Sequence, residues 1–405
     1  MPRDKKPIRV LYSFPNKLGA DRICYSAWQQ VNGLYNAGAQ LLVCPGSICR
    51  PVPAGVTLRP TLSRGKLRIP YKALGGNRAY ALHDYIVARR IEKLAGQIDI
   101  IHTWPRGARR TIQAATRLGI PTVLERSNAH TRYGFEVVQR ECDRLGIHLP
   151  PTNESAYNEE TLRIEEEEFG LADRLMCPSE FVVKTFLDKG FAPEKLARHI
   201  YGFDDKTYFP APDYQPNKGG LRMLFVGLCA VRKGVHYALE AWLRSSAHQS
   251  GTFTIAGEFL PDYAEKLAPM LSHPSVRVLG HRNDVAELVR NSDVLTLPSV
   301  EEGFGLVCTE AMGSGCVPLV SDACTDVCQH MQNALVHHVG DVEALARHIS
   351  VLNQDRMLLQ KLRSAGLEER ENLTWNAAGV KLLDAYRETI EMYGARPEPS
   401  EVHAR

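Results

Sequence analysis

The sequence predicts an α/β protein built from two domains of similar size. Its 405 residues exceed the usual domain length of about 100–150 residues, so a single domain is not expected. Short apolar runs alternate with helical stretches, a pattern typical of parallel sheets with helical crossovers. The alternation restarts near Leu224, after a stretch, 206–220, that holds three prolines and lacks apolar periodicity. We therefore predict domains over 1–205 and 221–373, with 206–220 as the linker.

The first half contains the elements of a β-α-β sheet. A strand over 8–14 leads through a loop that contains Gly19 to a helix over 21–37, and 41–44 forms the next strand. Ligands of open α/β sheets lie at the carboxyl ends of strands. The polar residues after the strand 121–125 are therefore candidates for a cleft, namely Arg126, Ser127, Asn128 and His130. A structural role is the alternative for an isolated histidine such as His130.

The second half repeats the pattern and ends in a helix. Further strands are expected at 224–227, 253–257, 276–280, 292–298 and 317–322. An amphipathic helix follows over 374–395, and residues 396–405 form a polar tail. In the first half, the four consecutive glutamates 165–168 are expected on the solvated face of a helix.

The composition is that of a soluble globular protein. Apolar residues make up 44% and charged residues 23%, and the net charge of +3 gives no case for nucleic-acid binding. The chain has no apolar stretch of membrane-spanning length and no signal-peptide pattern at its start. Its ten cysteines contain no Cys-x-x-Cys pair, which favours free thiols in a reducing compartment. We predict a cytoplasmic protein.

The stretch 300–312 carries the main functional signal. A buried strand ends before it, two glycines follow, and a helix begins at Leu306. The free N–H groups and positive dipole end of that helix favour an anion such as a diphosphate. Gly303 and Gly305 allow the backbone to approach a ligand closely. The stretch therefore predicts a phosphate-binding loop.

Two carboxylates, Glu302 and Glu310, flank this loop. Carboxylates repel a diphosphate, but they accept hydrogen bonds strongly from the hydroxyls of a sugar or a ribose. A phosphate loop with two hydroxyl acceptors describes a nucleotide-sugar site. The alternative is a solvated Glu301–Glu302 pair with Glu310 on a helix surface. In the loop after the strand 224–227, the cations Arg232 and Lys233 would neutralise the diphosphate.

The string from Leu297 to Pro318, with Glu-Gly-Phe-Gly-Leu, a second Glu, Ala-Met and Gly-x-x-Pro, resembles the nucleotide-sugar signature of GT4-type retaining glycosyltransferases. That family has the GT-B fold, in which two Rossmann-like domains face across a cleft and the C-terminal helix crosses back to the first domain. The resemblance implies transfer of a sugar from a nucleoside diphosphate to an acceptor hydroxyl, with retention. It is strong over 222–322 and weaker before 205, where the family's glycine pair is reduced to Gly19.

The resemblance also implies roles for individual residues. Glu302 and His130 are the expected catalytic residues. The donor would be bound by Gly19, Arg232, Lys233, Gly303, Phe304, Gly305, Leu306 and Glu310. No Asp-x-Asp motif lies near the loop, so no metal and no cofactor beyond the donor substrate are expected. A nucleotide-sugar epimerase of the same fold and a non-catalytic nucleotide-sugar-binding protein remain alternatives.

The segment 59–93 is rich in Lys and Arg interleaved with tyrosines. A solvated helix face explains this composition. The other interpretation is a surface that binds an anionic membrane or a phosphorylated acceptor. The expected partners are thus a nucleotide sugar, a sugar, glycan or lipid-linked acceptor, and the inner face of a membrane in peripheral contact.

Overall fold

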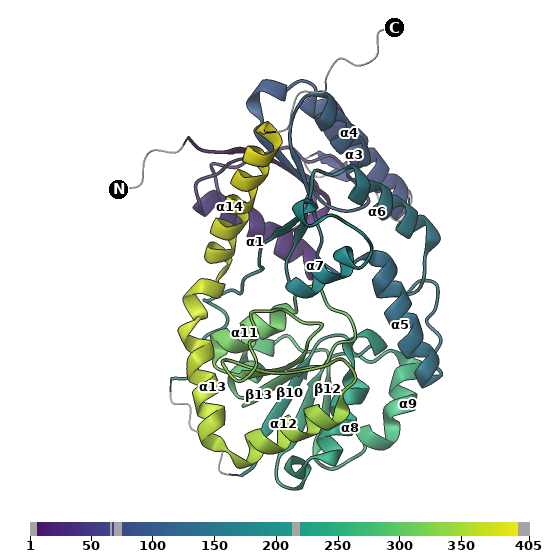
Figure 1. The fold of residues 1–405 in the computed structure, drawn as a ribbon, viewed down its shortest axis with the longest axis vertical. Helices are drawn as coiled ribbons and strands as arrows, with labels where there is room; N and C mark the ends of the chain where they lie inside the picture. Colours follow the sequence, from purple (N-terminus) through teal and green to yellow (C-terminus); the bar gives the residue numbers. More distant parts are fainter. Residues whose placement is uncertain (1–5, 65–66, 69–74, 213–218, 396–405) are drawn as a thin grey trace.

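Two parallel sheets with helices on their faces form the protein (Figure 1). The computed structural model describes residues 6–64, 67–68, 75–212 and 219–395. The first sheet has the strand order β3-β2-β1-β6-β7-β8-β9. Its strands are β1 (Arg9–Leu18), β2 (Gln40–Ile48), β3 (Thr57–Leu58), β6 (Ile100–Thr103), β7 (Thr122–Glu125), β8 (Arg174–Cys177) and β9 (Leu196–Arg198). A small antiparallel pair, β4 (Ser63–Arg64) and β5 (Leu67–Arg68), lies apart from it.

The second sheet has the order β12-β11-β10-β13-β14-β15, and all its pairings are parallel. Its strands are β10 (Arg222–Val226), β11 (Thr252–Ala256), β12 (Val276–Gly280), β13 (Val294–Leu297), β14 (Val317–Ser321) and β15 (Leu335–His337). The predicted α/β class with two parallel-sheet domains is confirmed. The strand order reverses between β1 and β6 in the first sheet and between β10 and β13 in the second, the positions where such sheets bind ligands.

Helices connect the strands. Those of the first half are α1 (Ile23–Asn36), α3 (Gly76–Ile91), α4 (Arg109–Arg117), α5 (Thr131–Leu145), α6 (Glu159–Leu171) and α7 (Glu180–Leu187). Those of the second half are α8 (Val235–Arg244), α9 (Pro261–Leu271), α10 (Val285–Arg290), α11 (Leu306–Ser314), α12 (Val342–Gln354), α13 (Arg356–Glu368) and α14 (Trp375–Gly394). Side-chain hydrogen bonds cap the N-termini of several helices. At α7, for example, the Ser179 hydroxyl accepts a hydrogen bond from the Val182 N–H.

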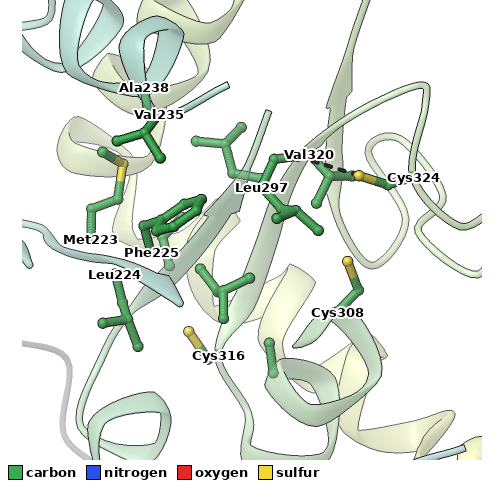
Figure 2. Packing of buried hydrophobic residues seen from close by; sticks show 14 of the residues in the cluster. Met223, Leu224, Phe225, Val235, Ala238, Leu297, Cys308, Cys316, Val320 and Cys324 are labelled. Carbon is green, nitrogen blue, oxygen red and sulfur yellow. Dashed lines mark hydrogen bonds between the residues drawn. The ribbon is translucent and has the colours of Figure 1, made fainter. Parts of the chain in front are cut away.

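The second sheet carries the larger core. Figure 2 shows side chains of β10, β13 and β14 meeting those of α8 and α11, including Phe225, Leu297 and Cys308. The Cys324 thiol donates to the Leu297 carbonyl oxygen at 3.3 Å. All ten cysteines are free thiols, and all except Cys24 and Cys49 are buried.

Helix α14 belongs to both cores. Trp375 and Ala378 lie in the core of the second sheet, whereas Leu382 and Tyr386 lie in that of the first. Its Gly379 packs against Gly33 of α1 so closely that a Cβ there would lie 2.3 Å from the Gly33 carbonyl carbon. Figure 1 shows the helix, in yellow, running along the domain that contains α1.

Helix α5 also joins the two domains, although it lies in the first half of the sequence. Val138 and Cys142 on its inner face belong to the core of the second sheet. The Glu141 carboxylate lies 2.8 Å from His236 Nε2 at the start of α8. Figure 1 shows α5 reaching down beside the domain of α8 and α9. Apolar and polar contacts thus tie α5 to the second domain.

Two local predictions were wrong. The strand β1 continues to Leu18 rather than ending at residue 14, because a register shift lets Lys17 and Leu18 pair with Ser47 and Ile48 of β2. Not all of the glutamates 165–168 are solvated. Glu168 is buried, and its carboxylate accepts the backbone N–H groups of residues 106 and 108 ahead of α4.

The predicted tail, 396–405, and part of the linker, 213–218, lie outside the described residues. Within the described part of the chain, no helix is both long and apolar enough to cross a membrane.

Candidate functional site

The loop between β13 and α11 lies against the first domain. Gly305 has a φ of 76° and precedes the first turn of α11, whose leading N–H groups have no acceptor within the helix. A Cβ on Gly303 would lie 1.6 Å from the Ser127 carbonyl oxygen. The Ser179 hydroxyl also donates to the Gly303 carbonyl at 2.6 Å. Gly303 is therefore required by the contact between the domains, a reason that the sequence did not indicate.

The two predicted cations contact the glutamates of this loop. Arg232 and Lys233 lie on a short 3-10 turn, η3 (Val231–Lys233), between β10 and α8. The Lys233 ammonium donates to the Glu302 carboxylate. Arg232 Nη1 lies 3.1 Å from Glu301 Oε2 and 3.9 Å from Glu302 Oε1. The structure thus brings Arg232, Lys233 and Glu302 together, as the prediction of a shared site requires.

A glycine allows this approach. Gly234, which follows Lys233, has a φ of 66°, and a Cβ on it would lie 1.9 Å from the Pro298 carbonyl oxygen. The Val300 N–H donates to the Arg232 carbonyl at 2.8 Å. The turn that carries the cations is therefore fixed directly to the end of β13.

Glu302 is held as a carboxylate. Burial alone would raise its pKa, but the charges of Lys233 and Arg232 more than offset that effect and lower the pKa below its ordinary value. The Ser299 hydroxyl lies 3.3 Å from Glu302 Oε2 and adds a hydrogen bond. Two cations thus lie opposite Glu301 and Glu302 in this site.

Glu310 lies in a different environment, one turn into α11. Burial raises the pKa of its carboxyl to about 7; the nearby Asp204 adds to the rise, and a hydrogen bond from Tyr208 opposes it. Burial raises the pKa of the Tyr25 phenol, which comes from α1 of the first domain, and the nearby Asp204 and Glu310 add to the rise. Sequence reasoning missed Asp204, which lies just before the predicted linker, and Tyr208, which lies within it.

Four other predicted residues are placed differently. The Phe304 side chain is buried against Tyr201, with ring centroids 5.6 Å apart, so only its backbone is available to a ligand. Leu306 is partly buried at the edge of the second core. Gly19 follows β1, where its φ is 79° and its carbonyl accepts from Arg50 Nε at 2.8 Å.

His130 is the fourth. Its ring is buried and lies 4.9 Å from the Phe186 ring and 5.4 Å from the Phe169 ring. Its Nδ1 accepts the Arg132 N–H, so that His130 caps α5. These contacts support the structural alternative, and a catalytic role for His130 stays a prediction that they do not favour.

Glu301 closes the domain contact. It is 4% exposed, and its Oε1 accepts the Ala129 N–H of the first domain at 3.1 Å while Oε2 faces Arg232. No sequence pattern distinguishes it from Glu302, because both are adjacent acids in a loop. The alternative of a solvated Glu301–Glu302 pair is wrong, since both side chains are buried. Among the described residues, no group of three His, Cys, Asp or Glu side chains is arranged to hold a metal ion.

Comparisons with known proteins identify relatives of this chain. The family model described as glycosyl transferases group 1 matches residues 220–355. A D-inositol 3-phosphate glycosyltransferase from Salinispora arenicola is 32% identical over 348 residues, covering 78% of this chain and 74% of the relative. Other curated relatives, including a glycogen synthase of Mycobacterium tuberculosis, align over only 46% of their own length, so the chain matches about half of each.

Solved structures share the fold. Sucrose-phosphate synthase from Thermosynechococcus elongatus superposes with a TM-score of 0.68 at 18% identity, over 96% of this chain and 100% of that one. The Anabaena protein HepE, solved in complex with UDP, gives a TM-score of 0.64 at 16% identity, over 95% and 100% of the two chains.

Proposed function

Because this chain belongs to the group 1 glycosyl transferases, the GT4-type enzymes with the GT-B fold, we propose that it moves a sugar from a nucleoside diphosphate to an acceptor hydroxyl at the loop between β13 and α11. The observation that carries this proposal is the pairing of Lys233 with Glu302 beside Arg232, at the strand reversal between β10 and β13. Cations placed beside the N-terminus of α11 suit the diphosphate of such a donor.

Each charged group then has a distinct task. Lys233 and Arg232 neutralise the charge that develops on the departing diphosphate, so transfer needs no metal ion. Glu302 is held ionised and lies beside these cations, where it orients the donor sugar and stabilises positive charge at the anomeric carbon. Glu310 accepts hydrogen bonds from the ribose. Retention of configuration is part of the proposal and rests on the family.

The first domain supplies the acceptor side. The loops after β7 and β8 contact the donor loop through Ala129 and Ser179, so an acceptor bound by the first domain would meet the donor there. Exposed cations on the segment 59–93, among them Arg78 and Arg89, support peripheral binding to an anionic membrane. Arg90 is not available for this, since it donates to the carbonyls of residues 59 and 60. Lys66 and Lys72 lie outside the described residues.

A donor screen tests the proposal. UDP-, GDP- and ADP-linked sugars are incubated with the full chain and a panel of sugar and lipid-linked acceptors, and nucleoside diphosphate release is measured. We expect acceptor-dependent release with one class of donor, and its loss in Glu302→Gln. NMR of the product separates the alternatives, because an isomerised donor formed without acceptor would indicate an epimerase. Saturable binding without release across the panel would indicate a binding protein.

A further inference from the structure

A cavity lies away from the proposed donor site. It has a volume of about 480 Å³, within the range of roughly 300–1,000 Å³ common for small-molecule sites. Residues of four regions line it: the end of β9, the loop 326–333 after β14, the segment 369–373, and one face of α14. The cavity therefore spans both domains and the helix that joins them.

Strand order separates this cavity from the donor site. The donor loop follows β13, beside the strand reversal at β10, whereas β9 is the edge strand of the first sheet. None of the residues assigned above to the donor lines the cavity. A ligand bound here would thus leave the donor loop open.

A buried histidine lines the cavity, and in the described part of the chain one of its ring nitrogens is unpartnered. His199 lines the cavity and is only 2% exposed. Its Nε2 lies 2.9 Å from Glu125 Oε1, but its Nδ1 has no hydrogen-bond partner among the described residues. Leaving such an atom unsatisfied costs about 1–3 kcal/mol, so a ligand group that bonds it is favoured. A hydroxyl suits either protonation state of Nδ1, because it both donates and accepts.

The charges around the cavity argue against a charged ligand. Arg198 lies 2.8 Å from Asp326, which satisfies both. On α14, the Asp384 carboxylate pairs with Arg387 at 2.5 Å and that of Glu388 with Arg174 at 3.5 Å. Glu369 and Lys381 also line the cavity, so its four carboxylates are balanced by four cations once Arg387 and Arg174 are counted, and no excess of charge remains for a charged ligand.

Neutral hydrogen-bonding groups complete the lining. The side chains of Gln329, Asn333 and Asn372 contribute amides, and Lys381 contributes an ammonium group for which the described residues supply no ion-pair partner. Donors and acceptors in close alternation match a ligand with many hydroxyls. We propose that this cavity binds a neutral sugar or polyol, at a site separate from the donor cleft. Such a ligand contacts both domains and stabilises their observed arrangement.

Hydrogen exchange of the full chain tests the proposal. Glucose, sucrose, trehalose and mannitol serve as probes, each with and without a saturating nucleoside diphosphate. We expect at least one probe to slow amide exchange in peptides covering 326–333 and 381–388, whether or not the nucleotide is present. Absence of protection in these peptides with every probe, or protection that nucleotide abolishes, would overturn the proposal.

Two variants locate the binding. Gln329→Trp places an indole at the exposed rim and should remove the protection, whereas Met357→Trp adds one to an exposed position of α13 outside the cavity and should not. Lys381→Met removes a donor from an exposed position and should weaken binding roughly 2- to 12-fold, the factor for one hydrogen bond. Nucleoside diphosphate affinity should be unchanged in all three. Protection that persists in Gln329→Trp would refute binding in this cavity.

Discussion

Replacement of Lys233 by alanine should weaken nucleoside diphosphate binding strongly. The Lys233 ammonium is the nearest cation to Glu302, and both side chains are largely buried, at 17% and 9% exposure. A hydrogen bond to a charged group contributes about 1.5–3 kcal/mol, which corresponds to a factor of about 10–150 in Kd. In this structure, however, Lys233 pairs with Glu302, and the diphosphate must compete for it. We therefore expect the lower part of this range, about tenfold.

The competition gives a sharper test in a second background. Glu302→Ala leaves Lys233 free for the diphosphate, so this variant should bind nucleoside diphosphate as well as the natural protein or better. Removing Lys233 from the Glu302→Ala variant should then reduce nucleoside diphosphate affinity by a larger factor than removing it from the natural protein. Isothermal titration of the four proteins with UDP, GDP and ADP measures both differences.

The same change should affect the ionisation of Glu302. Burial raises its pKa and Lys233 supplies the largest opposing charge, so Lys233→Ala should shift the acid limb of the kcat profile to higher pH. Lys361→Ala, at an exposed position on α13, is the matched control. A Kd of Lys233→Ala for nucleoside diphosphate within about threefold of that of the control would refute the assignment of Lys233 to the diphosphate. The assignment would also be refuted if removal of Lys233 weakened binding more with Glu302 present than without it.

Four further predictions concern Glu302, Glu301, Glu310 and the segment 59–93. Glu302→Gln should lower kcat on the order of 10²-fold with nucleoside diphosphate affinity nearly intact, as steady-state kinetics and titration would show; near-normal turnover would contradict its role. Glu301→Ala should lower the free energy of unfolding, measured in urea, by about 1–3 kcal/mol, because the Ala129 N–H and the Arg232 guanidinium lose this carboxylate as an acceptor. An effect no larger than that of Glu258→Ala, a control at an exposed position, would show the contact to be unimportant. Burial raises the pKa of Glu310 to about 7, and ribose hydroxyls bind its ionised form more strongly, so nucleoside diphosphate affinity should rise as the pH passes 7. The rise is measured relative to Glu310→Gln, because titration of that variant in parallel corrects for ionisation of the phosphate. A fall in relative affinity would contradict the ribose assignment. Co-sedimentation with anionic vesicles should occur at low salt and decrease as salt screens the segment 59–93, and no sedimentation at low salt would leave its cations as a solvated surface.

The loop between β13 and α11 could be predicted from sequence because its signals are local. A strand, two glycines and the start of a helix lie within a few residues, and the spacing of Glu302 and Glu310 follows from that helix. The cations were found for the same reason, since Arg232 and Lys233 occupy an equivalent loop. The two-domain α/β fold was predictable from the repeated alternation of strands and helices.

The remaining features depend on contacts between distant segments. Nothing local distinguishes Glu301 from Glu302; only the approach of Ala129 gives Glu301 its partner. The burial of Glu168 was not predicted because it depends on the backbone of residues 106 and 108, about sixty residues earlier in the chain. His130 was placed near a strand end correctly, but the phenylalanines around its ring come from α6 and α7.

The position of α5 has a consequence for recombination between relatives. Exchange of halves at residue 205 would separate Val138 and Cys142 from the core in which they are buried, and would remove Glu141 from His236. Each hybrid would then have to accommodate a foreign helix face in the largest core of the protein. Segments 131–147 and 221–373 therefore form one unit of inheritance, although sequence order assigns them to different domains.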